Sequence, residues 1–183
     1  MQIVSVRGKS YGKRAVILVA LGANLPSLPH GRPSATLAAS LDLLSEYGVS
    51  LIRRSRWYET APVPMSDQPW YVNGVAEVAS DLAPGPLLSA LHAIEARLGR
   101  ARGAINAARI IDLDLLDYDA RIVAGWPVLP HPRLHERAFV LRPLREIAPQ
   151  WRHPVTGASI DAMLARLGPE QLTRPLAGDD GQP

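Results

Sequence analysis

The chain has 183 residues and a mass of 19.8 kDa, a length that suits one well-packed domain rather than two. It contains no cysteine, which excludes disulfide scaffolds, Cys-ligated zinc, iron–sulfur clusters and thiol nucleophiles. The net charge is +3, and all but two of the 20 basic residues are arginines, the lysines being Lys9 and Lys13. Such an excess of arginine indicates either an anionic ligand or the codon usage of a GC-rich genome. Composition alone favours the explanation by codon usage.

The N-terminal region allows two interpretations. Residues 1–14 are basic, and the apolar run Ala15–Leu21 and small residues follow them, which is the order of a secretory signal. The same run is rich in β-branched residues and stops at a turn-like stretch, as a buried strand does. Because the run is short for a signal peptide and far below the roughly 18 residues of a transmembrane helix, we favour the strand.

Periodicity and turn residues predict the remaining elements. In chain order they are a helix over 35–47, a strand over 49–60, a loop over 61–69, a strand over 70–79, and a helix over 86–98, followed by a strand over 110–118, a mainly helical stretch over 134–147 and a short helix over 160–167. This order predicts a mostly antiparallel sheet covered by helices on one side. We expect one domain over 15–168, a basic extension over 1–14 and a flexible tail over 169–183.

Two aspartates on the last predicted strand are the strongest chemical signal in the chain. Side chains alternate along a strand, so Asp112 and Asp114 project to one face while Ile111, Leu113 and Leu115 enter the core. Like charges on one face repel each other unless a cation lies between them, and ligation by oxygen alone suits Mg²⁺. A solvated strand face is the alternative, because a single D-x-D pattern is common.

Arginines precede this strand in a stretch without clear periodicity, namely Arg100, Arg102 and Arg109. Beside paired carboxylates they would stabilise the charge that develops during phosphoryl transfer. For Arg100, a favourable cation at the C-terminus of the preceding helix explains the residue equally well. His131 is fixed between two prolines and is either a phosphate contact or a surface residue.

Thr60, Tyr71, Asn73 and Phe139 form a third group of candidates. Tyr71 and Asn73 alternate onto the same strand face, where a ring beside an amide can stack on a flat heterocycle and read its edge. Packing of the ring in the core, with Asn73 at a turn, is the alternative. The sequence has no Walker A, G-x-G-x-x-G, G-x-S-x-G or H-E-x-x-H motif, so a phosphoryl transferase here is not of the P-loop kind.

Several segments, met in the same order, resemble the 6-hydroxymethyl-7,8-dihydropterin pyrophosphokinase family. Together they extend over residues 16–165, and a series of matches in order is more specific than any one of them. The segments are 20–25 (ALGANL), 58–62 (YETAP), 67–73 (DQPWYVN), 99–102 (GRAR), 109–114 (RIIDLD) and 130–141 (PHPRLHERAFVL).

The resemblance implies an α+β fold (an α/β sandwich), with a ferredoxin-like, mostly antiparallel sheet and helices packed on it. It implies Mg²⁺-dependent transfer of pyrophosphate from ATP to 6-hydroxymethyl-7,8-dihydropterin, giving AMP and the pterin diphosphate in folate biosynthesis. It also implies a monomer in the cytoplasm, without a nucleic-acid or membrane partner. The run Ala15–Leu21 would then be the first core strand and not a secretory signal.

The resemblance also assigns roles to residues. Two Mg²⁺ ions, bound with ATP, would be held by Asp112 and Asp114, and Arg100 and Arg109 would act with this pair in catalysis. The residues expected to bind ATP are Leu88, Arg100, Arg109, Leu115, Val128, His131 and Arg137. The residues expected to bind the pterin are Thr60, Val63, Tyr71, Asn73 and Phe139.

The chain departs from the family pattern at the loop 105–109 (INAAR), which is short and has Ile105 where a cation is expected, and at Trp126, where many members have arginine. These departures bear on loop closure and nucleotide affinity. Another Mg²⁺-dependent nucleotidyl or phosphoryl transferase, or a catalytically weakened paralogue, is therefore the alternative. A nucleic-acid-binding module would fit the basic charge, but the sequence lacks its RNP-like aromatic pattern.

Overall fold

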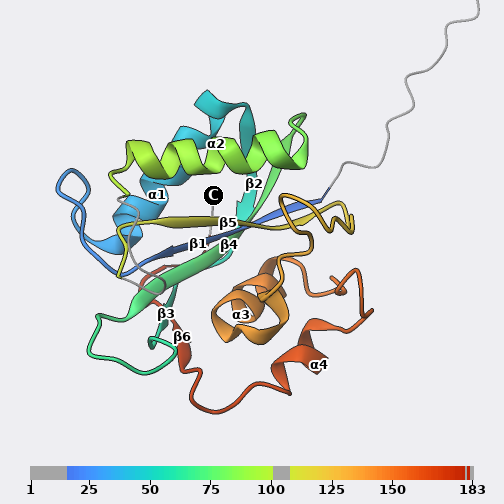
Figure 1. The fold of residues 1–183 in the computed structure, drawn as a ribbon. Helices are drawn as coiled ribbons and strands as arrows, with labels where there is room; N and C mark the ends of the chain where they lie inside the picture. The colour runs from blue at the N-terminus through green and yellow to red at the C-terminus, as the bar shows by residue number, and fades with distance from the viewer. Residues whose placement is uncertain (1–15, 101–107, 180, 182–183) are drawn as a thin grey trace, which may run out of the picture.

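The computed structural model describes residues 16–100, 108–179 and 181, which build an α+β fold around a six-stranded sheet (Figure 1). All strand pairs are antiparallel, in the order β5-β1-β4-β3-β6, and β2 also pairs with β4. The strands are β1 (Ile17–Ala23), β2 (Val49–Arg54), β3 (Tyr58–Thr60), β4 (Tyr71–Ser80), β5 (Asp112–Tyr118) and β6 (Thr173–Pro175). The expected fold class is thereby confirmed.

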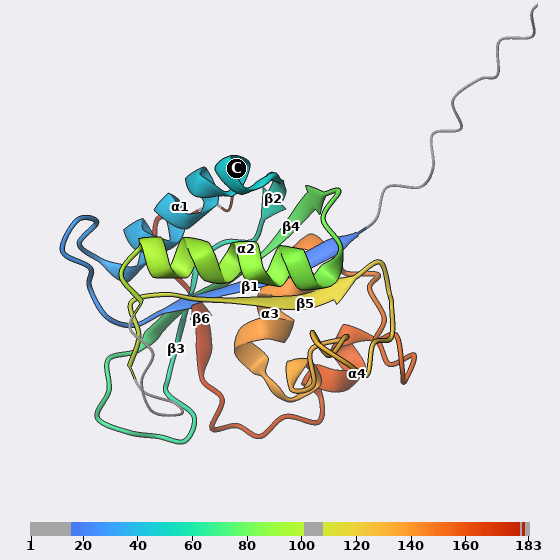
Figure 2. The same cartoon turned by 45° about the horizontal axis from the view of Figure 1, so that its top comes forward.

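Helices cover both faces of this sheet. In Figures 1 and 2, α1 (Pro33–Leu43) and α2 (Pro84–Arg97) lie on one face, and α3 (Ala138–Ile147) and α4 (Ile160–Leu164) lie on the other. The prediction that helices cover one side only is therefore wrong. None of the helices in the described ranges has the length and apolar character that a bilayer-crossing helix needs.

The central strand β1 accounts for the two helical layers. Its residues Ile17, Val19 and Leu21 belong to the core beneath α1 and α2, whereas Leu18 packs into the core beneath α3 and α4. A strand that is buried on both faces has a nearly continuous apolar sequence, which the segment ILVALGA shows. The strand interpretation of this run is thus confirmed, with bounds two residues later than expected at each end.

The strand predicted over 49–60 is two strands, β2 and β3, that pair with successive parts of β4. The break falls at Ser55–Trp57, where the indole of Trp57 lies so close to Gly74 that a Cβ on this glycine would lie 2.6 Å from a ring carbon. The buried indole therefore occupies the space that a side chain at position 74 would fill.

The predicted helices exist but end differently. The one expected over 35–47 is α1 followed by a 3₁₀ turn, η1 (Leu44–Tyr47), which ends at Gly48 with φ of +72°. The helical stretch expected over 134–147 is a second 3₁₀ turn, η2 (Leu134–Glu136), and α3, because Arg137 between them is extended. Helix α4 is shorter than expected.

Part of the segment expected as a flexible tail belongs to the sheet. Thr173–Pro175 forms β6 beside β3, and the Leu176 N–H donates to the Trp57 carbonyl at 2.8 Å. Farther along, the Asp179 carboxylate accepts two hydrogen bonds from Arg54, at 2.7 and 2.9 Å, and a third from the Trp57 N–H. The expectation is wrong for this stretch because its contacts are made with residues more than a hundred positions earlier.

Candidate active site

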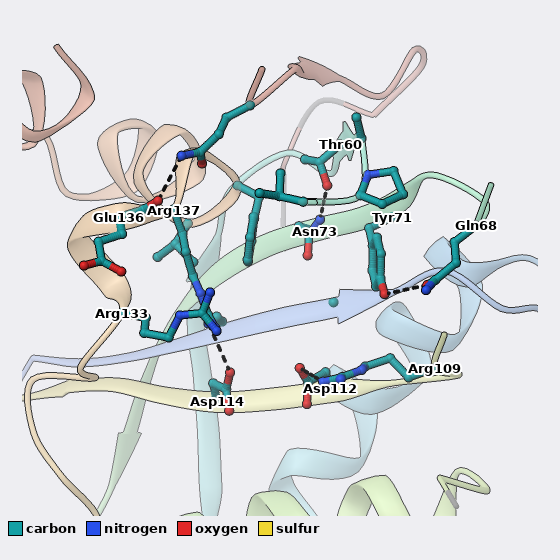
Figure 3. A pocket seen from close by; sticks show the side chains of 18 of the residues that line it. Thr60, Gln68, Tyr71, Asn73, Arg109, Asp112, Asp114, Arg133, Glu136 and Arg137 are labelled. Carbon is teal, nitrogen blue, oxygen red and sulfur yellow. Dashed lines mark hydrogen bonds and ion pairs between the residues drawn. The ribbon is translucent and has the colours of Figure 1, made fainter. Parts of the chain in front are cut away.

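The two aspartates of β5 lie on one face of the strand, as the alternation predicts. Ile111, Leu113 and Leu115 are at most 3% exposed, while the Asp112 and Asp114 side chains are 24% and 36% exposed. Burial of the alternate leucines against α2 holds the carboxylates toward the opposite face of the sheet. They line the pocket drawn in Figure 3.

Arginines from both sides of the residues 101–107 converge on Asp112. Arg100 and Arg109 each bring a guanidinium nitrogen within 2.6 Å of one of its carboxylate oxygens. The structure thus joins Arg100 and Arg109 to the carboxylate pair. The expectations for Arg102 and Ile105 concern residues outside the described ranges.

Asp114 faces a second group of basic side chains, from the segment before α3. His131 Nε2 and Arg137 Nη1 both lie 3.9 Å from its carboxylate. The His131 N–H donates to the Leu116 carbonyl at 2.8 Å, which holds this loop against β5. Burial and the charge of Asp112 raise the pKa of Asp114. Burial also lowers the pKa of His131 and, with the charge of Arg133, that of Arg137. Burial therefore disfavours the charged form of each of these three groups.

A third carboxylate, Glu95, lies beneath this pair and was not predicted. It is 4% exposed on the inner face of α2, accepts a hydrogen bond from the Leu113 N–H at 2.6 Å and pairs with Arg100. Burial raises its pKa to about 7. The signal in the sequence was a glutamate among the apolar positions 87, 91, 94 and 98 of the buried helix face. Glu95 positions both Arg100 and the backbone between the two aspartates.

Uncharged side chains line the other end of the pocket. The Asn73 amide donates to Thr60 Oγ1 at 2.7 Å, and the Tyr71 ring lies beside it on the same face of β4 (Figure 3). Asn73 also needs Gly22 on β1, because a Cβ there would lie 2.7 Å from the Asn73 amide oxygen. Phe139, the second residue of α3, lines the pocket from the helical layer that α3 and α4 form. The predicted group of Thr60, Tyr71, Asn73 and Phe139 is thus brought together.

Two names describe this pocket below. The charged half comprises Arg109, Asp112, Asp114, Arg133 and Arg137, and the neutral half comprises Thr60, Val63, Tyr71, Asn73, Phe139 and Gln171. Among these, Arg133 and Gln171 were not predicted. Five of the residues expected at the ATP site do not line the pocket and belong to neither of its halves. Leu115 is buried in the core, Leu88 packs against that core, and Val128 is 46% exposed. Arg100 pairs with Asp112 and Glu95, and His131 lies 3.9 Å from Asp114 and accepts from the Arg133 N–H at 3.2 Å.

Asn24 joins the two halves and was also missed. Its side chain is almost completely buried, and its amide oxygen accepts from the Arg109 N–H at 2.8 Å. Its amide nitrogen donates to Gln68 Oε1 at 3.3 Å and to the Pro69 carbonyl at 3.2 Å. Gln68 in turn accepts from the Tyr71 hydroxyl at 3.2 Å. One buried amide therefore ties the arginine of the charged half to the ring of the neutral half.

The carboxylate pair fits a hard cation that completes its ligands elsewhere. Within the described ranges, no cluster of three or more His, Asp or Glu could hold a metal ion. Two carboxylates with four oxygens, one of them desolvated beside a like charge, suit an ion such as Mg²⁺ that takes its other ligands from water and phosphate. The donors thus suit a metal that binds together with its substrate.

Comparison with known proteins agrees with this geometry. Residues 18–149 match the model of the family described as 7,8-dihydro-6-hydroxymethylpterin-pyrophosphokinase (HPPK). The 2-amino-4-hydroxy-6-hydroxymethyldihydropteridine pyrophosphokinases of Methylorubrum extorquens and Pseudomonas aeruginosa are each 37% identical, over 84% and 86% of this chain and 94% and 95% of their own lengths.

Longer proteins are similar over part of their length. The folic acid synthesis protein fol1 of Pneumocystis carinii is 35% identical over 82% of this chain, which spans 20% of that protein. Among solved structures, a Plasmodium falciparum HPPK-DHPS triple mutant superposes with a TM-score of 0.66 at 14% identity, over 86% of this chain and 45% of the other. This likeness concerns the fold. From the family match and the bacterial relatives, the chain belongs to the 7,8-dihydro-6-hydroxymethylpterin-pyrophosphokinase (HPPK) family.

Proposed function

We propose that this protein transfers the pyrophosphoryl group of ATP to the hydroxymethyl group of 6-hydroxymethyl-7,8-dihydropterin, giving AMP and the pterin diphosphate. The observation that carries the proposal is that one pocket joins a charged half to a neutral half. A triphosphate needs cations, whereas a pterin is a flat, uncharged heterocycle that needs rings and amides. A pocket divided in this way accepts both partners of such a transfer.

The neutral half would hold the pterin. Tyr71 and Phe139 supply aromatic faces, and Asn73, held by Thr60, presents an amide to the hydrogen-bonding edge of the ring. Val63 adds an apolar contact from the loop after β3. With the ring held there, its hydroxymethyl group would extend toward Asp114.

The charged half would hold the phosphates of ATP. Arg109 and Arg137 would interact with negative charge on the transferring group. Arg100, which pairs with both Asp112 and Glu95, would hold Asp112 in place. Asp112 and Asp114 would hold Mg²⁺, in the family's case two ions, and these ions when bound would neutralise phosphate oxygens. His131 would contact a phosphate from beside Asp114.

Leu88, Leu115 and Val128, which the family resemblance assigns to ATP, would lie at its adenine end. Because the Leu115 side chain faces the core, only its backbone is available to a nucleotide. We also propose a single catalytic domain that extends beyond residue 168 to include β6, and a monomer in the cytoplasm with ATP and the pterin as its partners.

Nucleotide analysis tests this proposal. The protein is incubated with MgATP, with and without 6-hydroxymethyl-7,8-dihydropterin, and AMP and ADP are separated by ion-exchange chromatography. AMP that accumulates in step with the phosphorylated pterin, and only when the pterin is present, is the expected result. ADP as the main nucleotide product, or AMP formed equally without the pterin, would show that the proposal is wrong.

A further inference from the structure

The neutral half is closed by a segment that is distant in sequence from every predicted site residue but reaches the pocket in the fold. Gln171 lines the pocket three residues after Gly168, and β6 begins two residues later. This segment is part of the stretch expected as a tail, so nothing in the sequence indicated that it reaches the site.

The Gln171 side chain makes two hydrogen bonds to the backbone at the start of α3. Its amide oxygen accepts from the Ala138 N–H at 2.8 Å, and its amide nitrogen donates to the Glu136 carbonyl at 3.0 Å. The Ala138 N–H is one of the first in its helix and has no acceptor within that helix, and Arg137 before it supplies no side-chain cap. Because one partner is a donor and the other an acceptor, only one orientation of the amide satisfies both.

The next residue is bonded to the opposite wall of the neutral half. The Leu172 carbonyl accepts from the Ala61 N–H at 3.1 Å, and Thr173 pairs with Thr60 across β3 and β6. The pair of adjacent residues 171–172 therefore spans the distance between the start of α3, which carries Phe139, and the end of β3, which carries Thr60.

We propose that Gln171 is a positioning residue for the pterin: it sets the distance between the Phe139 wall and the Thr60–Ala61 wall. The inference rests on the proposed function and adds a residue to its pterin site. A shift of the α3 start moves the Phe139 ring directly, because a ring with two side-chain torsions follows its backbone. Arg137, directly before α3, would move with it as well, but its long side chain can change rotamer and still reach Asp114.

Two substitutions separate this role from packing. Gln171→Met keeps the length of the side chain and removes both hydrogen bonds, whereas Gln171→Glu keeps an acceptor for the Ala138 N–H and loses the donor to Glu136. Gln150→Ala, in the exposed turn after the other end of α3, is the matched control. For each variant, KM for the pterin, KM for ATP, kcat and the melting temperature are measured.

The expected result for Gln171→Met is a pterin KM about tenfold higher, with KM for ATP and kcat within about twofold of the wild type, since two modest hydrogen bonds are lost. Gln171→Glu is expected to lie between this variant and the wild type, and Gln150→Ala to match the wild type. Equal rises in both KM values, or a lower melting temperature with an unchanged pterin KM, would overturn the inference.

A binding titration separates this inference from the proposed function. The intrinsic fluorescence of 6-hydroxymethylpterin is followed on addition of the wild type and of Gln171→Met, without ATP. Weaker binding by the variant supports the positioning role even if the wild type forms no AMP, a result that would overturn the proposed reaction alone. Equal binding by the two proteins, or no binding by the wild type, overturns the role of Gln171.

Discussion

The two halves of the pocket hold their side chains by different forces. In the charged half, Asp112 and Asp114 face guanidinium groups and the neighbouring His131 imidazole at 2.6 to 3.9 Å, and burial shifts the pKa values of Asp114, Arg137 and that histidine. In the neutral half, Asn73 and Gln171 are held by hydrogen bonds between uncharged groups. The side chains of the charged half are thus held by the balance of positive and negative charge. Those of the neutral half are held by the geometry of hydrogen bonds.

The largest expected effect comes from removing charge. Asp112→Asn and Asp114→Asn keep the size of each side chain and halve the negative charge of the pair, so AMP formation should fall at least about a thousandfold, several kcal/mol of transition-state stabilisation. Single-turnover rates at saturating MgATP measure the loss. Asp119→Asn, exposed just beyond β5 at a positive φ that asparagine tolerates, is the control. Near-normal rates in either variant would contradict the assignment of the carboxylates.

The neutral half should respond in affinity rather than in rate. Asn73→Leu removes the hydrogen bond to Thr60 and leaves that buried hydroxyl without its donor. The KM for the pterin should rise roughly 10- to 100-fold, the cost of one or two lost buried hydrogen bonds, while KM for ATP stays within about twofold. Steady-state kinetics with each substrate varied in turn measure both. A matching rise in KM for ATP would mean that the two halves are not separate.

Asn24 tests the connection between the halves. Asn24→Ala removes its bonds to Arg109, Gln68 and Pro69 together, so both KM values should rise, each about tenfold. A double-mutant cycle with Asn73→Leu, read in KM for the pterin, should show that the two effects are not additive. Strict additivity, or an effect confined to one substrate, would remove Asn24 as the link.

A separate prediction concerns stability and pH rather than substrate kinetics. Glu95 has a pKa of about 7 in the folded protein and an ordinary value of 4.5. Below the lower value both states hold the proton. As pH rises from 4.5 to about 7 the unfolded chain releases it first, so stability falls. Glu95→Gln removes this dependence, and its unfolding free energy relative to the wild type should rise by about 3 kcal/mol over that window.

Urea denaturation of both proteins at several pH values measures this difference. The variant keeps a carbonyl oxygen as acceptor for the Leu113 N–H, so the comparison isolates the charge. A difference between the two proteins that does not change with pH would contradict the raised pKa.

The halves also differ in how far the sequence predicts them. Asp112, Asp114 and Arg109 lie within six residues on one strand and its approach, and period-two alternation is enough to place them on one face. The neutral half joins β3, β4, the start of α3 and β6. Tyr71 and Asn73 follow from alternation, but no periodicity connects them to Phe139, which was grouped with them by residue type and by the family resemblance.

Residues that act by long-range hydrogen bonds gave no local signal. Asn24 bonds to partners more than forty positions away, and Gln171 to partners 33 and 35 positions away. Their residue types are common in loops, so no periodicity distinguishes them. The second helical layer was missed for a similar reason: the apolar sequence of β1 indicates burial but not which segments of the chain cover each face.

The central claim is that one pocket transfers two phosphoryl groups as a unit, and the fate of the β-phosphorus tests it most directly. ATP labelled at the β position is incubated with the protein, Mg²⁺ and 6-hydroxymethyl-7,8-dihydropterin, and the products are separated. The label should appear in the pterin product, with unlabelled AMP formed in equal amount. Label that remains in ADP, with only the γ-phosphoryl group on the pterin, would contradict the account.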